Sequence, residues 1–355
     1  MIDHRVSVGD IRNAADRIKG YVHRTPTLTC STLDNLAANP DVGLKLFFKC
    51  DNFQKVGAFK IRGATNAILS LLSSHPDRSP SEFSVITHSS GNHAQALAYA
   101  SQALGVRCHV VMPSNSASVK KDAVRGYGAM VTECVPTLQA REDGVNAIIS
   151  EMRASGKEIT FIPPYDDVRV IAGQGTMALE LMEQAASLDA PLDILIAPVG
   201  GGGMLSGCAV AAKGVDPGIW VVGAEPAGAD DAYRSFNAKK FIPSVDPQTI
   251  ADGLRTSLGE ITFPLIMANV DAIHTVSEVE IVRAMKLVYE RMKLVVEPSA
   301  AVGLAVALYG SEFKEQIRIL ASKKQKQDLN VGIIFSGGNV DLANLSTLFD
   351  IAGNN

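Results

Sequence analysis

The sequence is poor in aromatic residues, in cysteine and in excess charge of either sign. Only 6% of its 355 residues are aromatic, and 33 basic residues against 37 acidic ones leave a net charge of −4. This balance excludes the dense basic field that nucleic-acid binding requires. No run approaches the roughly 18 apolar residues of a membrane span, so no membrane partner is expected.

The five cysteines lie far apart and include no CxxC pair. A disulfide framework or a zinc site of paired cysteines is therefore not expected. A reducing compartment suits such a chain, and we expect a cytoplasmic protein.

What the chain does contain is a regular alternation of apolar runs and helical patterns, which predicts an α/β fold. At about 150 residues per domain, the length corresponds to roughly two domains. Turn-rich segments at 73–80 and 162–167 indicate a small domain, 82–158, inserted into a large one made of 1–81 and 159–355. Strands are expected at 45–50, 84–88, 107–112, 130–134, 193–198, 220–224 and 331–336, and helices at 91–104, 138–153, 173–186 and 278–293.

Four consecutive glycines, Gly200, Gly201, Gly202 and Gly203, follow one predicted strand and open a helix. Glycines at such a junction let backbone N–H groups approach a phosphate, whose charge the helix N-terminus also stabilises. The run is neither a Walker loop nor the GxGxxG pattern of dinucleotide binding. A tight turn without a ligand is the alternative, but four glycines in a row favour phosphate binding.

A basic stretch with the sequence Gln-Lys-Val-Gly-Ala-Phe-Lys-Ile-Arg-Gly occupies positions 54–63. Taken alone, it reads as a solvated basic turn. The alternative is that apolar Phe59 and the nearby charge of Arg62 lower the pKa of Lys60 and free its amine as a nucleophile.

Two further polar turns follow predicted strands, at 88–95 and at 335–341. Small hydroxyl and amide groups there present donors to a cleft at the carboxyl ends of the strands. Such residues also serve as ordinary helix caps, which is the simpler interpretation. A metal pair of His88 and His93 lacks a third ligand nearby.

In this order, the stretches resemble the fold-type II pyridoxal-phosphate enzymes, the family of serine and threonine dehydratases and serine racemase. The resemblance runs from about Ile11 to the end and implies a tryptophan synthase β-like fold, in which a large parallel or mixed sheet domain carries a smaller inserted α/β domain. It rests on the motifs at 24–26, 54–64, 89–93, 172–176, 200–203, 224–226, 250–253, 296–298 and 336–339.

By this resemblance, Lys60 binds pyridoxal phosphate covalently and is the catalytic base, with Ser90 as the acid on the opposite face. The implied cofactor-binding residues are Phe59, Lys60, Asn92, Gly200, Gly201, Gly202, Gly203, Met204, Gly253, Glu297 and Ser336. The implied substrate-binding residues are Ser89, Ser90, Asn92, His93 and Arg141, the last of which could equally be a surface helix residue.

The resemblance also implies two further sites and an assembly. Glu225, the carbonyl of Ala229 and Asp231 would bind Mg²⁺, Mn²⁺ or Ca²⁺, cations that prefer oxygen ligands. Like some relatives, the chain would form a homodimer. An ATP effector would then contact Ser31, Lys55, Tyr127, Arg291, Lys293 and Asn339.

The expected activity is interconversion of L- and D-serine, with α,β-elimination to pyruvate and ammonia as a side reaction. The alternative is a dehydratase of L-serine, L-threonine or threo-3-hydroxyaspartate. The segment Pro-Pro-Tyr-Asp at 163–166 resembles that of the dehydratase more closely than that of animal racemase. From the residues alone, a nucleotide-binding regulatory or dehydrogenase-like protein also remains open.

Overall fold

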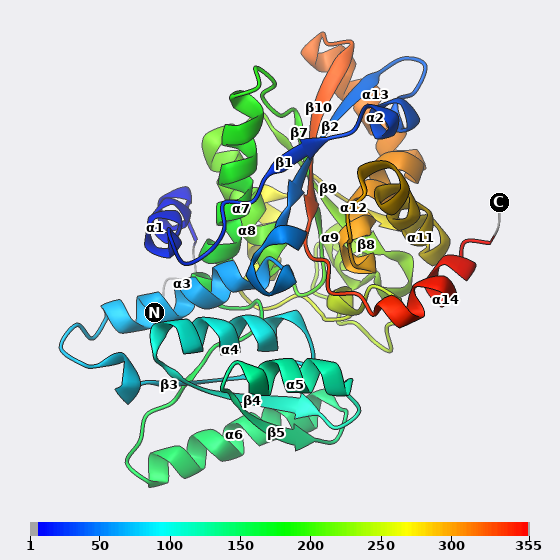
Figure 1. Cartoon of the computed structure of the whole chain (residues 1–355). Helices are drawn as coiled ribbons and strands as arrows, with labels where there is room; N and C mark the ends of the chain where they lie inside the picture. The colour runs from blue at the N-terminus through cyan, green and yellow to red at the C-terminus, as the bar shows by residue number, and fades with distance from the viewer. Residues whose placement is uncertain (1–5, 354–355) are drawn as a thin grey trace.

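The computed structural model describes residues 6–353 and contains two β-sheets, one above the other in Figure 1. All neighbouring strands are parallel except β1 and β2, so the predicted α/β fold is confirmed. The larger sheet has the order β1 (Thr27–Thr29), β2 (Gly43–Cys50), β10 (Asp328–Phe335), β7 (Ile194–Pro198), β8 (Trp220–Pro226) and β9 (Ala272–Val276). The smaller sheet has the order β5 (Met130–Cys134), β4 (Arg107–Pro113), β3 (Ser84–His88) and β6 (Thr160–Phe161).

Helices cover both faces of each sheet, as parallel strands require. The helices are α1 (Val8–Ile18), α2 (Ser31–Ala37), α3 (Lys60–Ser73), α4 (Asn92–Leu104), α5 (Ser118–Gly126), α6 (Leu138–Ala154), α7 (Val168–Ala186), α8 (Gly203–Val215), α9 (Asp231–Ala238), α10 (Thr262–Asn269), α11 (Glu278–Leu287), α12 (Pro298–Tyr309), α13 (Ser311–Lys324) and α14 (Leu345–Asp350). None of the helices within 6–353 is long and apolar enough to cross a membrane.

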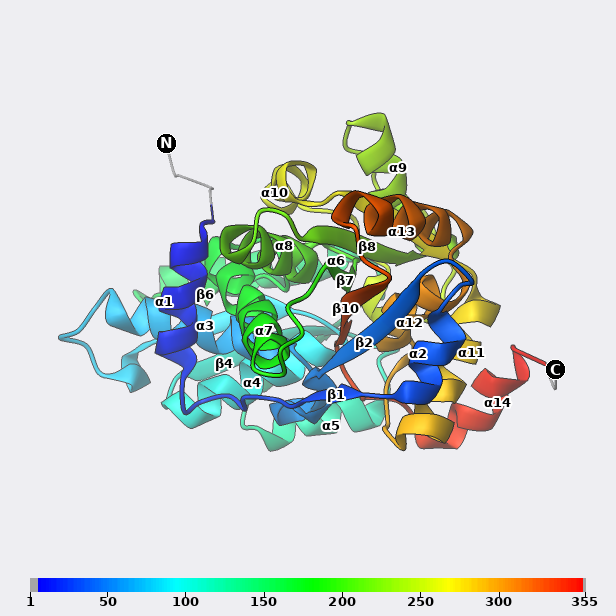
Figure 2. The same cartoon turned by 90° about the horizontal axis from the view of Figure 1, so that it is seen from above.

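The large sheet separates two apolar cores. Along β10, Val331, Ile333 and Phe335 pack in one core with residues of α11 and α12, whereas Ile334 packs in the other with residues of α7 and α8. This alternation follows from the two-residue period of a strand. Figure 2 shows the two pairs of helices on opposite sides of the sheet.

The small sheet lies between α6 on one face and α3 and α4 on the other. Its strands run from Ser84 to Phe161, so β6 falls just outside the predicted small domain, 82–158. The division into domains at 81/82 and 158/159 stays a prediction.

Each predicted strand is present: those at 84–88 and 130–134 have the predicted limits, and the limits of the others differ by one to three residues. Strands β1 and β6 were not predicted, because three and two residues are too few to show a period. Strand β9, which has five residues, was also missed. Helix α7 begins earlier than expected, at Val168, because the side chain of Asp167 accepts hydrogen bonds from the first-turn N–H groups. Helix α11 ends at Leu287 and continues as a π-helix, Val288–Met292, rather than as α-helix to 293.

A buried polar network joins β2, α3 and α7. Arg62 is fully buried and pairs with Asp51 at 2.6 Å and with Glu180 at 2.8 Å. Thr25 donates to Asp51 at 2.6 Å, and Lys49 pairs with Glu180 at 2.7 Å. Burial alone would raise the pKa of Asp51, but the charge of Arg62 holds it below its usual value.

We expect Arg62→Met to lower the free energy of unfolding by about 3–5 kcal/mol, because it leaves the carboxylate of Asp51 buried without its partner. Denaturant unfolding of the two proteins measures this loss. Arg125→Met removes an exposed pair with Glu133 and should cost no more than about 1 kcal/mol. Equal losses in the two variants would show that the buried network does not stabilise the fold.

Candidate active site

The polar segments singled out in the sequence follow β2, β3, β7 and β10, at the carboxyl ends of these strands. In parallel sheets this end is where ligands bind, since loops diverge there and helix N-termini point inward. Hydrogen bonds join the segments that follow strands of the two different sheets, and the sequence alone does not reveal these bonds.

Lys60 is the first residue of α3, and its amine donates a hydrogen bond to the carbonyl oxygen of Pro164 at 2.7 Å. Its Nζ lies 5.0 Å from the centre of the Phe59 ring. Burial lowers the pKa of Lys60 to about 8, against the opposing effect of the Glu297 carboxylate. The expectation that Arg62 lowers this pKa is wrong, because the guanidinium of Arg62 is neutralised by Asp51 and Glu180 behind α3.

Asn92, the first residue of α4, connects the small sheet to the large one. Its amide nitrogen donates to both carboxylate oxygens of Glu297, at 2.9 and 3.1 Å. Asn339 donates in turn to Asn92 Oδ1 at 2.9 Å and to the carbonyl of Val56 at 2.8 Å. Three expected residues from distant parts of the chain therefore form one chain of hydrogen bonds.

Glu297 is buried at the start of α12 and packs against the turn that follows β10. A Cβ atom on Gly337 would lie 2.8 Å from Glu297 Oε1, so a larger residue there would displace the carboxylate. Burial raises the pKa of Glu297 to about 7, and the charge of Asp252 adds to the effect. Ser336 is also buried, and its hydroxyl makes no hydrogen bond to a residue within 6–353.

The four glycines form a buried turn between β7 and α8. A Cβ atom on Gly201 would lie 2.4 Å from the Tyr165 ring, and Gly202 has a φ of +87° that side-chain-bearing residues rarely adopt. Within the described chain, the N–H groups of Gly200 to Gly203 donate to no acceptor. Unpaired donors at a helix N-terminus fit the phosphate of the expected cofactor.

Sequence reasoning gave no role to Tyr165, Asp166 and Thr262, which hold this turn in place. The Asp166 carboxylate accepts from the backbone N–H groups of residues 260, 261 and 262, at 3.0, 2.9 and 3.1 Å. Thr262 then donates to the carbonyl of Gly201 at 2.8 Å. The only clue in the sequence was an acidic residue, Asp166, in the turn-rich segment 162–167. This did not reveal its distant partners at 260–262.

Of the expected substrate-binding residues, Ser90 is exposed and Ser89 accepts from the N–H of Gly91 at 3.2 Å. His93 Nε2 lies 3.1 Å from the carbonyl oxygen of Ile162. Because that oxygen only accepts, Nε2 carries the proton and Nδ1 is an acceptor. Burial, aided by the charge of Lys60, lowers the pKa of His93 to about 3, so the ring is neutral. Its Nδ1 is therefore suited to accept a hydrogen bond from a donor group rather than to bind a carboxylate.

Arg141 lies half-buried on α6 and donates weakly to the carbonyl of Thr137 at 3.4 Å. Burial lowers the pKa of His88 to about 4, and the charge of Arg141 contributes to this shift. Arg141 therefore acts electrostatically on the residue that precedes Ser89 and Ser90.

The expected cation site contains two buried carboxylates. Glu225 accepts from the N–H groups of Ala232 and Tyr233 at 2.9 and 2.7 Å, and burial raises its pKa to about 9. Both carboxylate oxygens of Asp231 are buried without a hydrogen-bond partner within 6–353, and burial raises the pKa of Asp231 to about 6. A buried carboxylate without a hydrogen-bond partner, as at Asp231, fits a bound cation. Such a cation would also need the carbonyl of Ala229, because no three acidic, His or Cys side chains gather in the described part of the chain.

Contacts connect only some of the expected effector residues. Lys55 lies over the Tyr99 ring at 5.8 Å, and Tyr99 contacts Tyr127 edge-on at 5.4 Å. Asn339 joins this group through its bond to Val56. No hydrogen bond or ion pair within the described chain joins Ser31, Arg291 or Lys293 to them.

Comparison with known proteins agrees with this geometry. The chain is 49% identical to the serine racemase of Dictyostelium discoideum, over 97% of this chain and 98% of that protein. It is 44% identical to the beta-hydroxyaspartate dehydratase of Paracoccus denitrificans, over 95% of this chain and 97% of that one. The structure of maize serine racemase matches with a TM-score of 0.85 and 40% identity, over 96% of both chains.

The model of the family described as "Pyridoxal-phosphate dependent enzyme" matches residues 18–322. This range includes Lys60, the tetraglycine turn and Glu297, and leaves only Ser336 and Asn339 of the hydrogen-bonded site beyond its end. The chain therefore belongs to the family of pyridoxal-phosphate dependent enzymes, with the fold of its type II members.

Proposed function

We propose that this protein is a serine racemase that interconverts L- and D-serine and also eliminates water from serine to give pyruvate and ammonia. The observation that carries the proposal is the placement of Lys60. It is an amine with a pKa of about 8 at the carboxyl ends of the strands, beside a turn of unpaired N–H groups. The relatives named serine racemase, which match nearly the whole chain, support the same activity.

We first assign the residues that would hold the cofactor. When bound, pyridoxal phosphate withdraws electrons from the α-carbon of an amino acid and makes its α-proton acidic. The N–H groups of Gly200 to Gly203 and the N-terminus of α8 would hold the phosphate, with Met204 and Gly253 beside them. Phe59 would pack on the ring, and Asn92 and Ser336 would bind its polar edges. A neutral hydroxyl at Ser336 limits how strongly the ring withdraws electrons.

Lys60 is suited to remove the α-proton. At pH 7 an amine with a pKa of about 8 is neutral in about a tenth of the molecules, against fewer than about one in a thousand for an ordinary lysine. We propose Ser90 as the proton donor on the opposite face, since return of the proton there inverts the α-carbon. Ser89, Asn92, His93 and Arg141 would orient the substrate.

A dehydratase of serine, threonine or threo-3-hydroxyaspartate is the second candidate. The identity to the beta-hydroxyaspartate dehydratase, 44%, equals that to the serine racemase of Arabidopsis thaliana. The two activities share the removal of the α-proton, so Lys60 and the phosphate turn serve both.

We further propose a cytoplasmic homodimer that binds Mg²⁺, Mn²⁺ or Ca²⁺ at Glu225, Ala229 and Asp231. An ATP effector would contact Ser31, Lys55, Tyr127, Arg291, Lys293 and Asn339. The large domain would be 1–81 with 159–355, and the small domain 82–158.

Incubation with L-serine, D-serine and L-threo-3-hydroxyaspartate tests the function. We expect D-serine to appear from L-serine, together with slower formation of pyruvate, measured by chiral chromatography and a keto-acid assay. Lys60→Ala should lose both products and the visible absorbance of the bound cofactor. Formation of oxaloacetate or pyruvate without any D-serine would contradict the racemase and support the dehydratase.

Ser90→Ala should lower racemisation about 10²–10⁴-fold, the usual contribution of a positioned acid, while α-proton exchange of L-serine with solvent persists. Exchange in deuterium oxide, followed by NMR, separates the two steps. Ser89→Ala is the matched control, because a substrate-binding residue should affect both steps alike. Equal losses of racemisation and exchange in Ser90→Ala would contradict its role as the opposite-face acid.

The cation site predicts opposite effects of one variant with and without metal. Mg²⁺ or Ca²⁺ at a hundred times its Kd should raise the free energy of unfolding by about 2.7 kcal/mol, and Asp231→Asn should abolish this gain. Without added cation, Asp231→Asn should be at least as stable as the parent, because it removes a buried unpaired charge. The exposed Asp16→Asn should keep the metal effect, and stabilisation of Asp231→Asn by the cations would contradict the site.

A further inference from the structure

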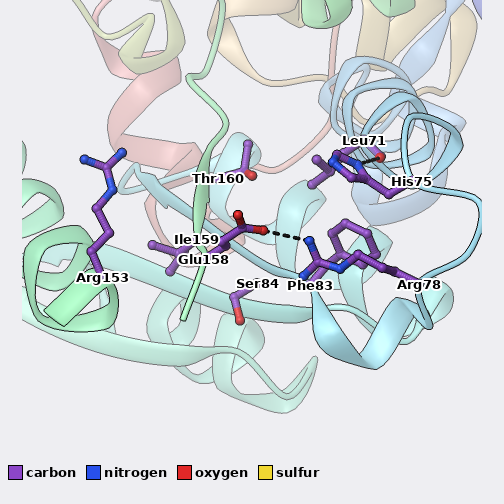
Figure 3. A pocket seen from close by; sticks show the side chains of 9 residues that line it. All are labelled: Leu71, His75, Arg78, Phe83, Ser84, Arg153, Glu158, Ile159 and Thr160. Atoms are coloured by element: carbon purple, nitrogen blue, oxygen red, sulfur yellow. Dashed lines mark hydrogen bonds and ion pairs between the residues drawn. The ribbon is translucent and has the colours of Figure 1, made fainter. Parts of the chain in front are cut away.

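A hollow of about 330 Å³ opens at the amino-terminal edge of the small sheet, away from the carboxyl ends that carry the active site. Ser84 and Thr160, the first residues of β3 and β6, lie on its wall (Figure 3). A second hollow of about 470 Å³ adjoins it and reaches Arg107, the first residue of β4. The two hollows share Arg78, Ser84 and Glu158, so they are adjacent; together they are here called the edge pocket.

The edge pocket gathers positive charge in a chain whose net charge is negative. Four basic side chains line it, and two acidic ones, Glu82 and Glu158, oppose them. Glu158 pairs with Arg78 at 2.7 Å, and the carboxylate of Glu82 accepts from the N–H of Ser79. The other basic side chains have no ion pair within 6–353; they are Arg107, Arg153 and Lys157.

The floor and walls of the edge pocket supply both apolar surface and unpaired hydroxyl groups. Phe83 and Ile159 are buried beneath it, and the guanidinium of Arg78 lies 4.5 Å from the centre of the Phe83 ring. Neither Ser84 nor Thr160 makes a side-chain hydrogen bond within the described residues. In Figure 3, Arg153 lies on the side opposite Arg78.

We propose that the edge pocket binds the phosphate group of a small molecule. Unpaired basic side chains around one hollow stabilise a group with two or more negative charges, and a planar guanidinium matches two phosphate oxygens at once. The two free hydroxyl groups add neutral donors. The apolar floor offers contact area to an organic portion, such as a nucleoside.

The position of the edge pocket gives its ligand a route to the active site. Helix α3 begins at Lys60, and Leu71 near its other end lines the pocket. Strand β3 leads from the pocket to the turn of Ser89, and β6 leads to Pro164, which accepts the hydrogen bond of Lys60. A ligand that bridges the pocket would stabilise one arrangement of these three elements.

Titration calorimetry of the holoenzyme with AMP, ATP and inorganic phosphate tests the site. Arg153→Ala with Lys157→Ala should weaken binding at least about tenfold, because two charge-assisted contacts are lost. Both side chains are exposed, so the fold and the visible absorbance of the cofactor should not change. The control, Arg12→Ala with Lys240→Ala, makes the same change of charge at exposed positions elsewhere and should bind as the parent does.

Glu158→Gln should have the opposite effect and tighten binding, since it releases Arg78 and removes a repulsive carboxylate. Tighter binding of AMP than of inorganic phosphate would assign the ligand as an organic phosphate, and equal binding would assign it as free phosphate. The proposal is overturned if none of the three probes binds, or if binding of all three survives the double variant, as it would at the separate effector site. These measurements do not depend on the racemase activity.

Discussion

The arrangement of the active site depends on the buried ion pairs of Arg62 with Asp51 and Glu180. Arg62 follows Lys60 by two residues on α3, and side chains two apart on a helix point in different directions. Because Arg62 is fixed between Asp51 and Glu180, α3 is held in one rotation about its axis. The same rotation directs the amine of Lys60 to the carbonyl oxygen of Pro164. Pro164 belongs to the segment that also contains Tyr165 and Asp166, which contact the glycine turn and the N-terminus of α10.

Burial of the side chains away from water then determines which groups at the site are charged. Burial lowers the pKa of Lys60 to about 8 and of His93 to about 3, whereas it raises the pKa of Glu297 to about 7. Acids and bases move in opposite directions because burial penalises the charged form of both. The site therefore holds an amine that deprotonates readily, a neutral imidazole and a carboxyl group near its titration point, which suits removal and return of a proton.

The small sheet has different chemistry at its two ends. Its carboxyl end is followed by Ser89, Ser90 and Asn92, and its amino end forms the cationic edge pocket. Asn92 connects the carboxyl end to Glu297 at the start of α12, while Arg78 and Glu158 join the segments at the amino end. The two connections place the small sheet between the active site and the edge pocket.

The sequence alone determined the alternation of strands and helices, the glycine turn and the identity of the polar segments. These are local features, because apolar periods and glycine runs act within a few residues of the chain. Tertiary structure decided which segments meet: Asp166 with the N-terminus of α10, Asn92 with Glu297, and Pro164 with Lys60. It also corrected the reason for the low pKa of Lys60: Arg62 is only two residues away in sequence, but Asp51 and Glu180 neutralise its charge. Asp166 and its partner are 95 positions apart, Pro164 and Lys60 are 104 apart, and Asn92 and Glu297 are 205 apart, so no local pattern could reveal these contacts.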